Sequence, residues 1–236
     1  MSERVKIILD KNADILRLPA IALRGLVVFP GNIIHFEVGR KKSIAAIEWA
    51  MSNNNAVFLT AQQDMDVEDP GFKDLYAYGV VAEVKQVLRV SDELVKVLVE
   101  GKYRAKLLTL DSSGRFLLAS TKAAALRGTK SVDSARMEAL VRSVKEVFEE
   151  YLSLNPRLSK DVVYTIITNE DAALLCDYIP ANLLLKYTDK QALLNEGTVS
   201  GRLEKLLEIL RREMKENPLI EIKTNTDVLG IYSDRV

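Results

Sequence analysis

Hydrophobic and polar positions alternate along the first half of the chain. Short runs rich in Val, Ile and Phe are separated by Pro, Gly, Asn and Asp, as is typical of β structure. In the clearest run, Val95, Val97 and Val99 share one face of a strand, while Lys96 and Glu100 mark the other. The pattern predicts strands at residues 21–23, 32–38, 57–61, 78–90, 94–100, 104–110 and 116–123.

One helix and one hairpin are predicted among these strands. Ile44, Ile47 and Met51 recur at helical spacing, which predicts a helix over residues 43–51 that ends at the asparagines that follow. The short polar turn at residues 91–93 predicts that the strands on either side of it form an antiparallel hairpin.

After Gly128 the hydrophobic spacing changes from two residues to about three and a half, which predicts a helical region. The longest stripe runs from Met137 to Tyr151, with Ser131 as its N-cap and Asn155 and Pro156 at its end. Two more helices are predicted to begin after Ser159 and after Asn169.

Three further signals divide the rest of this region. Pro180 is predicted to open a short helix, because proline is favoured in the first turn. Thr188 and Gln191 have the spacing of a capping box. The last helix is predicted from about Val199 to Pro218. One face of it carries Leu203, Leu206, Leu207, Leu210 and Met214.

The predicted fold class is therefore α+β with segregated halves. We expect a β-rich lobe at residues 1–126, a helical-bundle lobe at 127–217 and a tail at 218–236. The join near residues 127–131 is short and polar, so relative movement of the lobes is the default expectation.

The composition gives no sign of a charged ligand or a membrane. The 236 residues carry 33 Lys and Arg against 33 Asp and Glu, so no overall field attracts nucleic acid or anionic lipid. Cys176 lies in an apolar helical pattern typical of a small buried side chain in a reducing compartment. No secretion signal is visible, and no apolar run reaches the ~20 residues of a spanning helix. We expect a soluble, cytoplasmic protein.

Motifs for catalysis and metal binding are missing. A P-loop needs two glycines and a lysine at fixed spacing, and the nearest text, residues 127–130, has one glycine. The one histidine, His35, cannot build a multi-histidine zinc site and is interpreted as a strand residue. The acidic residues between 64 and 69 lack EF-hand spacing, which favours a solvated loop. We expect no catalytic centre, metal or cofactor.

The order of motifs in the first half resembles the amino-terminal domain of the ATP-dependent Lon protease family. Leu-Arg at 23–24 precedes an apolar run that Pro closes at 26–30, and Val-Gly-Arg at 38–40 precedes a helix. DLYAYGVVAEV at 74–84 and VKVLVEGKYRAKL at 95–107 match the family's paired central strands and its Glu-Gly-x-x-Arg-Ala turn. The match extends over about a hundred residues, and a fold with a PUA-like pseudo-barrel is what the resemblance implies.

The helical half also resembles this family, since RLEKLLEIL at 202–210 matches the start of the family's long helix toward its ATPase. The resemblance ends at Asn217 and Pro218, where a strand-like LIEI replaces the expected charged helix. The family implies an ATP-dependent endopeptidase with a Ser-Lys dyad, whose ATPase and protease domains we do not find in this sequence. We therefore expect a free-standing or truncated recognition domain, which would join such modules if the natural chain is longer.

The resemblance implies binding of unfolded, damaged or degron-bearing polypeptides and self-association. The candidate substrate contacts are Phe29, Pro30 and Ile33, together with the basic loop of Arg40, Lys41 and Lys42. Core burial is the competing interpretation for the first three residues, and simple solvation is the competing interpretation for the loop. The candidate self-association residues are Leu203, Leu206, Leu207, Leu210 and Met214.

Two other classes of function stay open at this point. One is a small-ligand-binding or hydrolytic protein that uses a cleft between the lobes. The other is a purely oligomerising scaffold. Nucleic-acid binding is disfavoured, because few aromatic residues accompany the basic clusters at 39–43 and on the last helix.

Overall fold

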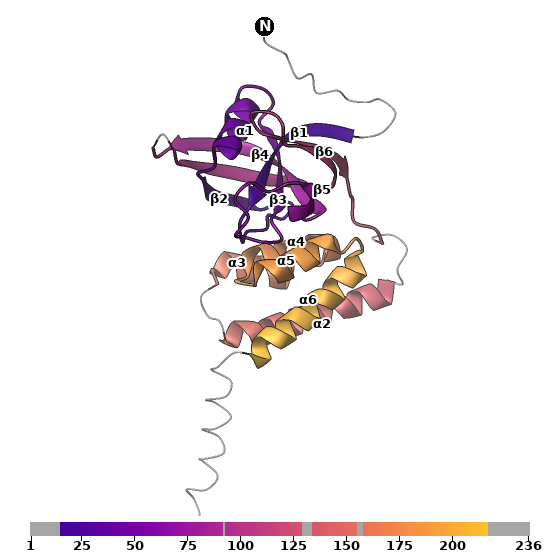
Figure 1. Cartoon of the computed structure of the whole chain (residues 1–236). Coiled ribbons are helices and arrows are strands. Elements are labelled where there is room, and N and C mark those ends of the chain that lie inside the picture. Colours follow the sequence, from indigo (N-terminus) through magenta and orange to yellow (C-terminus); the bar gives the residue numbers. More distant parts are fainter. Residues whose placement is uncertain (1–14, 92, 129–133, 155–157, 217–236) are drawn as a thin grey trace, which may run out of the picture. The chain divides into compact units, whose positions relative to one another are not determined.

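The computed structural model describes residues 15–91, 93–128, 134–154 and 158–216. The chain divides into two compact units, whose elements Figure 1 labels. The first unit comprises Met1–Arg127 and Leu184–Gly197, and the second comprises Gly128–Leu183 and Thr198–Val236. The fold is of the mixed α+β kind, as the sequence predicts.

A six-stranded sheet forms most of the first unit. The strands are β1 (Ile15–Leu23), β2 (Ile33–Val38), β3 (Ala56–Ala61), β4 (Tyr78–Arg89), β5 (Val95–Asp111) and β6 (Leu117–Ala123). Their order is β2-β5-β4-β3-β1-β6, and β6 pairs with β5 as well as with β1. The pairings therefore lead from β5 through β4, β3, β1 and β6 back to β5. Helix α1 (Lys41–Met51) and the short 3-10 helix η1 (Phe72–Asp74) lie in the connections.

The apolar residues of these strands form a continuous core. Its members come from every strand of the closed set of pairings and include Leu18, Phe58, Val81, Leu107 and Leu117. Burying such a side chain contributes roughly 1.5–3 kcal/mol, so the alternation seen in the sequence translates directly into the stability of the sheet. The predicted hairpin is confirmed, because β4 and β5 pair in antiparallel fashion.

The strand prediction is wrong around Gly101. The sequence predicts two strands with a Glu-Gly-x-x-Arg-Ala turn between them, whereas β5 runs unbroken from Val95 to Asp111. Its register against β4 shifts between Val81 and Ala82, so β5 contributes one extra residue there. A side chain at Gly101 would place its Cβ 2.2 Å from the Phe29 carbonyl oxygen. Glycine is therefore required here by a close backbone approach, and not by a turn.

The second unit contains four helices among the residues that the structure describes. They are α2 (Ser134–Leu154), α3 (Lys160–Thr168), α4 (Ala172–Asn182) and α6 (Val199–Lys215). The predicted start after Ser159 is confirmed, since its hydroxyl caps α3 by accepting from the Val162 N–H. Helix α6 packs on α2 and α4 through a core that includes Phe148, Ile179 and Leu206. Ser131, Asn155, Pro156 and Pro218, predicted as helix boundaries, lie outside the described residues.

Two helix predictions are wrong. Pro180 lies inside α4 and opens no new helix. Helix α5 (Tyr187–Asn195) begins after Lys186 with no side-chain cap, so Thr188 and Gln191 form no capping box. The Gln191 amide nitrogen instead donates to the Tyr78 carbonyl oxygen over 2.9 Å. Helix α5 thus belongs with the strands of the first unit, a grouping that the hydrophobic spacing does not predict.

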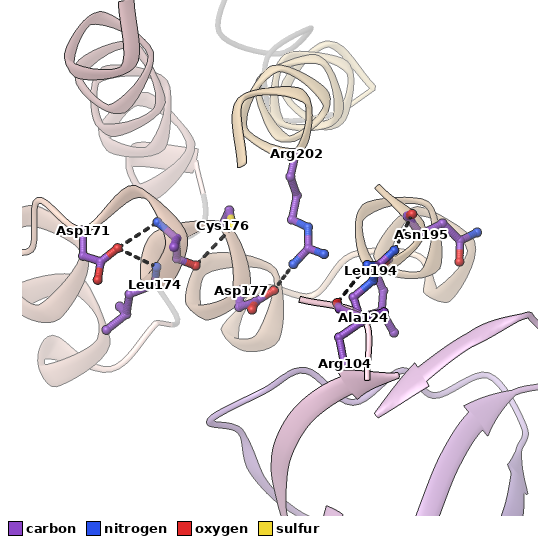
Figure 2. Close-up of polar contacts among 10 residues, drawn as sticks. Arg104, Ala124, Asp171, Leu174, Cys176, Asp177, Leu194, Asn195 and Arg202 are labelled. Carbon is purple, nitrogen blue, oxygen red and sulfur yellow. Dashed lines mark hydrogen bonds and ion pairs between the residues drawn. The ribbon is translucent and has the colours of Figure 1, made fainter. Parts of the chain in front are cut away.

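Arg104 attaches α5 to the strands. Its Nε donates to the Leu194 carbonyl oxygen over 2.6 Å, and its Nη2 donates to the Asn195 carbonyl oxygen over 2.7 Å, as Figure 2 shows. The same guanidinium lies 3.9 Å from the centre of the Tyr78 ring. A cation at the last carbonyls of a helix satisfies acceptors that the helix itself leaves open. The arginine of the Glu-Gly-x-x-Arg-Ala motif is therefore a structural residue of the first unit.

Candidate functional site

Exposed side chains gather on the outer face of β2, β5 and β4. The register places three rows of residues across these strands. The rows are Ile33–Glu100–Glu83, His35–Leu98–Gln86 and Glu37–Lys96–Leu88. Because diagonal neighbours in a sheet lie within reach of large side chains, Ile33, Leu98 and Leu88 form a continuous apolar path across the three strands. Val90, two residues beyond Leu88 and just past the end of β4, extends this path.

We call Ile33, Leu98, Leu88 and Val90 the apolar diagonal. Ile33 is 63% exposed, Leu88 58% and Val90 56%, while Leu98 is half-buried. The outer face is also hollowed: a groove of about 180 Å³ is lined by His35, Gln86, Leu88, Lys96, Val97 and Leu98. Large apolar side chains that stay exposed next to one another are what a surface for apolar partners requires.

A second register shift explains why Leu88 and Val90 lie on the outer face. Val80, Ala82 and Val84 are buried, and simple alternation would place Gln86, Leu88 and Val90 on the same inner face. The shift between Val84 and Gln86 inserts Lys85 as an extra residue, which turns the even-numbered positions outward. Leu88 and Val90 could not be assigned to the outer face from the sequence, because a period of two carries no mark of an inserted residue. Leu98 needs no such shift, since alternation along β5 already places it on the face of Lys96 and Glu100.

Four charged residues border the diagonal on one side. Lys85 and Lys102 each bind both Glu83 and Glu100, with nitrogen–oxygen distances of 2.6–2.9 Å. Hydrogen bonds from Lys102 and then Lys85 lower the pKa of Glu100 to about 2. The same contacts, led by the one to Glu100, raise the pKa of Lys85. The two lysines and two glutamates therefore sum to zero charge, so the border of the apolar diagonal on this side carries no net charge.

The other side of β2 faces a larger cavity of about 320 Å³. Its lining includes Phe36 and Val38 from β2, Leu23 from the end of β1, and two arginines, Arg24 and Arg40. Arg40 donates to the Ala22 carbonyl oxygen over 3.2 Å and to the Val67 carbonyl oxygen over 3.1 Å. Arg24 donates to the same Val67 oxygen over 3.4 Å. Burial, and then the charge of Arg24, lower the pKa of Arg40.

The predicted substrate contacts are distributed over different environments. Phe29 is fully buried and Pro30 is half-buried, whereas Ile33 stands on the apolar diagonal. Arg40 lines the cavity, and Lys41 is exposed. Lys42 forms an ion pair with Asp69 over 2.9 Å. The structure therefore brings Ile33 together with residues that the sequence analysis did not select, and a role for each of the six in binding stays a prediction.

The predicted self-association residues lie within the second unit. Leu203, Leu206 and Leu210 are fully buried and Leu207 is nearly so, while Met214 is half-buried. The leucines are among the residues that pack α6 against its neighbours. Their apolar surface is already covered in the single chain, and their part in self-association stays a prediction.

Other reactive residues offer no second site within the described ranges. No group of three or more His, Cys, Asp or Glu residues there is arranged to hold a metal ion. Burial raises the pKa of Cys176 to about 12, so its thiol stays protonated and unreactive. No helix among the described residues is long and apolar enough to cross a membrane.

Comparison with known proteins identifies the family. Residues 17–212 match the family described as the ATP-dependent protease La (LON) substrate-binding domain. The chain belongs to this family. As a Lon substrate-binding domain it is 36% identical over 217 residues to Lon protease of Desulforamulus reducens, covering 92% of this chain and 26% of that protein. It is also 36% identical over 204 residues to Lon protease of Escherichia coli K12, covering 86% of this chain and 26% of the relative.

Solved structures of Lon domains share the fold. The N-terminal domain of Mycobacterium avium complex Lon protease aligns with a TM-score of 0.67 at 20% identity, covering 83% of this chain and 98% of that one. A Lon N-terminal domain protein from Xanthomonas campestris aligns with a TM-score of 0.57 at 15% identity, covering 81% and 97% respectively. This Lon substrate-binding domain spans about a quarter of the length of the curated relatives that it matches.

Proposed function

We propose that this Lon substrate-binding domain recognises unfolded or degron-bearing polypeptides, and that the apolar diagonal is where they bind. The observation that carries the proposal is the run of exposed Ile33, Leu88 and Val90, joined by the half-buried Leu98, on a surface otherwise lined by charged and polar residues. A folded protein hides its apolar segments, so an exposed apolar surface selects polypeptides that have lost their fold.

The size of the surface suits transient binding. Full burial of one Leu or Ile side chain contributes roughly 1.5–3 kcal/mol, and the diagonal offers only a few such side chains, already partly covered. Association costs at least ~4 kcal/mol of lost translational and rotational freedom. The net affinity is then low, which fits a domain that holds a client and releases it to a proteolytic module.

Family membership also supports proposals about the finer fold and the wider function. The closed set of pairings from β5 back to β5 supports a PUA-like pseudo-barrel, and α2, α3, α4 and α6 support a helical lobe. We propose that ATP hydrolysis and peptide cleavage are supplied by ATPase and protease modules of a Lon-type enzyme, with this chain as the recognition part. Self-association and a cytoplasmic location belong to this proposal.

A binding measurement tests the proposed surface. The double variant Ile33→Thr/Leu88→Thr keeps strand propensity but removes apolar area. It is expected to bind a fluorescein-labelled, permanently unfolded protein at least about tenfold more weakly, as measured by fluorescence anisotropy.

The matched control is Phe72→Thr, because Phe72 is 47% exposed yet lies in η1, away from the diagonal. Its affinity is expected to equal that of the unchanged chain. Equal weakening by both variants, or no weakening by the double variant, would reject the apolar diagonal as the binding surface.

A further inference from the structure

Strand β2 is an open edge of the sheet. Within the part of the chain that the structure describes, β2 pairs with β5 alone. Natural edge strands are commonly protected by proline, lysine or a bulge. The sequence IIHFEV contains no proline or lysine, and its register against β5 is unbroken from Ile33 to Val38. The edge therefore lacks these usual protections against pairing with another chain.

The hydrogen-bonding pattern between β2 and β5 shows which main-chain groups of β2 point away from the sheet. The Gly101 N–H donates to the Asn32 carbonyl oxygen over 2.9 Å, and the Gly31 N–H donates to the Gly101 carbonyl oxygen over 2.8 Å. Gly31 and Asn32 together therefore occupy the hydrogen-bonded position opposite Gly101, just before β2 begins. Bonded and non-bonded pairs alternate in an antiparallel ladder. The main-chain groups of Ile33, His35 and Glu37 consequently point outward, along the open edge. The N–H and C=O groups of these three alternate residues are thus available to an added strand.

Hollows lie on both faces of this edge. The groove beside His35 lies on the outer face, and the cavity beside Phe36 and Val38 lies on the inner face. Side chains of a strand added next to β2 would point alternately to these two faces. Main-chain pairing with pockets for alternate side chains is the arrangement by which sheets recognise extended peptides.

Charge in the inner cavity indicates the chemistry of the occupant. Arg24 and Arg40 both donate to the Val67 carbonyl oxygen, which places two cations beside one neutral acceptor. Glu37 is the one acidic residue in the lining, so two arginines against one carboxylate leave the lining with a net positive charge. A carboxylate entering the cavity would face both guanidinium groups, and a carboxylate–guanidinium contact is among the stronger hydrogen bonds in proteins. The occupant that fits is an extended segment with apolar side chains and a nearby acidic residue.

We propose that β2 captures an extended client segment by strand addition, with its main chain bonded to Ile33, His35 and Glu37, apolar side chains on the diagonal and a carboxylate near Arg24. This inference rests on the proposed function, since it describes how the same client is held. It adds a requirement that burial of apolar area alone does not impose, namely free amide groups at alternate positions of the client.

A backbone scan of the client tests this requirement. The probe is a fluorescein-labelled peptide of about ten residues that alternates valine with threonine and carries one glutamate. In separate peptides, each amide in turn is N-methylated, which removes one donor. Affinity for the unchanged chain is expected to fall about tenfold or more at every second position and to change little at the positions between. Uniform tolerance, or loss without a period of two, would overturn strand addition.

A variant of the protein provides the reciprocal test. His35→Pro removes an outward N–H without touching any bond to β5, and proline is tolerated at edge positions of this kind. It is expected to bind the peptide about tenfold more weakly than His35→Ala, which loses the same ring but keeps the N–H. Circular dichroism verifies that both variants fold. Equal affinity of the two folded variants contradicts the proposal.

A charge exchange tests the inner cavity. Arg24→Gln is expected to weaken binding of the glutamate peptide severalfold and to leave a glutamine version of the peptide unaffected. Equal effects on both peptides would overturn the part assigned to Arg24.

The remaining outcomes separate this inference from the function on which it rests. Normal binding of unfolded protein with no backbone periodicity rejects strand addition and keeps the client-binding function. No binding of any unfolded probe rejects both. Sedimentation that shows dimers lost in His35→Pro, with peptide binding unchanged, would assign the edge to a second copy of the chain and overturn the proposal.

Discussion

At the residue scale, Gly101 is a position in the first unit that has no room for a side chain. A methyl group there would lie 2.2 Å from the Phe29 carbonyl oxygen, which is far inside any tolerated contact. Strand β5 or the loop carrying Phe29 would have to move to admit it. The backbone of this loop is thereby held against the middle of β5, next to the start of β2.

We predict that Gly101→Ala lowers the free energy of unfolding by ~1–3 kcal/mol, the usual cost of forcing extra atoms into a packed site. Urea unfolding followed by circular dichroism measures the change. Gly114→Ala is the matched control, since its Cβ would meet nothing closer than the Phe116 carbonyl oxygen at 3.6 Å. If the two variants were equally stable, the close approach at Gly101 would be wrong.

At the element scale, the charged border joins β4 and β5 through side chains as well as through the ladder. Both carboxylates of the border have a pKa below the ordinary value. A carboxylate with a lowered folded-state pKa stabilises the fold above its unfolded-state pKa, and that stabilisation is lost as the pH falls through the folded-state value.

For Glu100 this window runs from the ordinary value of 4.5 down to about 2. We predict that Glu100→Gln flattens the acid-side decline of stability within that window and changes its slope little above it. Parallel urea titrations at several pH values measure the slopes. Added salt is expected to shrink the difference between the two chains, because these groups are exposed. An identical acid-side slope in both chains would exclude a contribution from Glu100.

Helix α6 provides the second element-scale prediction. Leu206 is fully buried, so Leu206→Glu places a carboxylate in the core of the second unit, where an unpaired charge is very costly. We predict loss of helical circular dichroism from the second unit, and not a folded chain of lower oligomeric state. A folded variant that sediments as a smaller species would instead support the self-association role of this stripe.

Alternation and helical spacing predicted most elements but could not show where the register between two strands shifts. Strands β2, β3 and β6 and helices α1 and α6 lie close to their predicted positions. The bulges at Lys85 and near Gly101 depend on contacts between distant segments, so a local pattern cannot reveal them. For this reason the outward position of Leu88 could not be predicted from the sequence.

At the scale of the whole molecule, α5 could not have been assigned correctly from spacing alone. It follows three helices and precedes another, yet its partners are Tyr78, Arg104 and the other residues of the first unit. Its assignment depends on side-chain hydrogen bonds that span about ninety residues of sequence. Family resemblance, by contrast, was readable from the order of motifs and is confirmed over residues 17–212.

The placement of α5 also bears on how the chain folds during its synthesis. When translation has passed Arg127, strands β1 to β6 have been made, but Arg104 still lacks the Leu194 and Asn195 carbonyl groups. At about 5–20 residues per second, the ribosome needs several more seconds to supply them. During that interval the nascent first unit is incomplete, because Arg104 is without those two acceptors. The part of the chain between Arg127 and Leu194 is meanwhile leaving the ribosome. The protein is thus itself, for a few seconds, an unfinished polypeptide of the kind that we propose it binds.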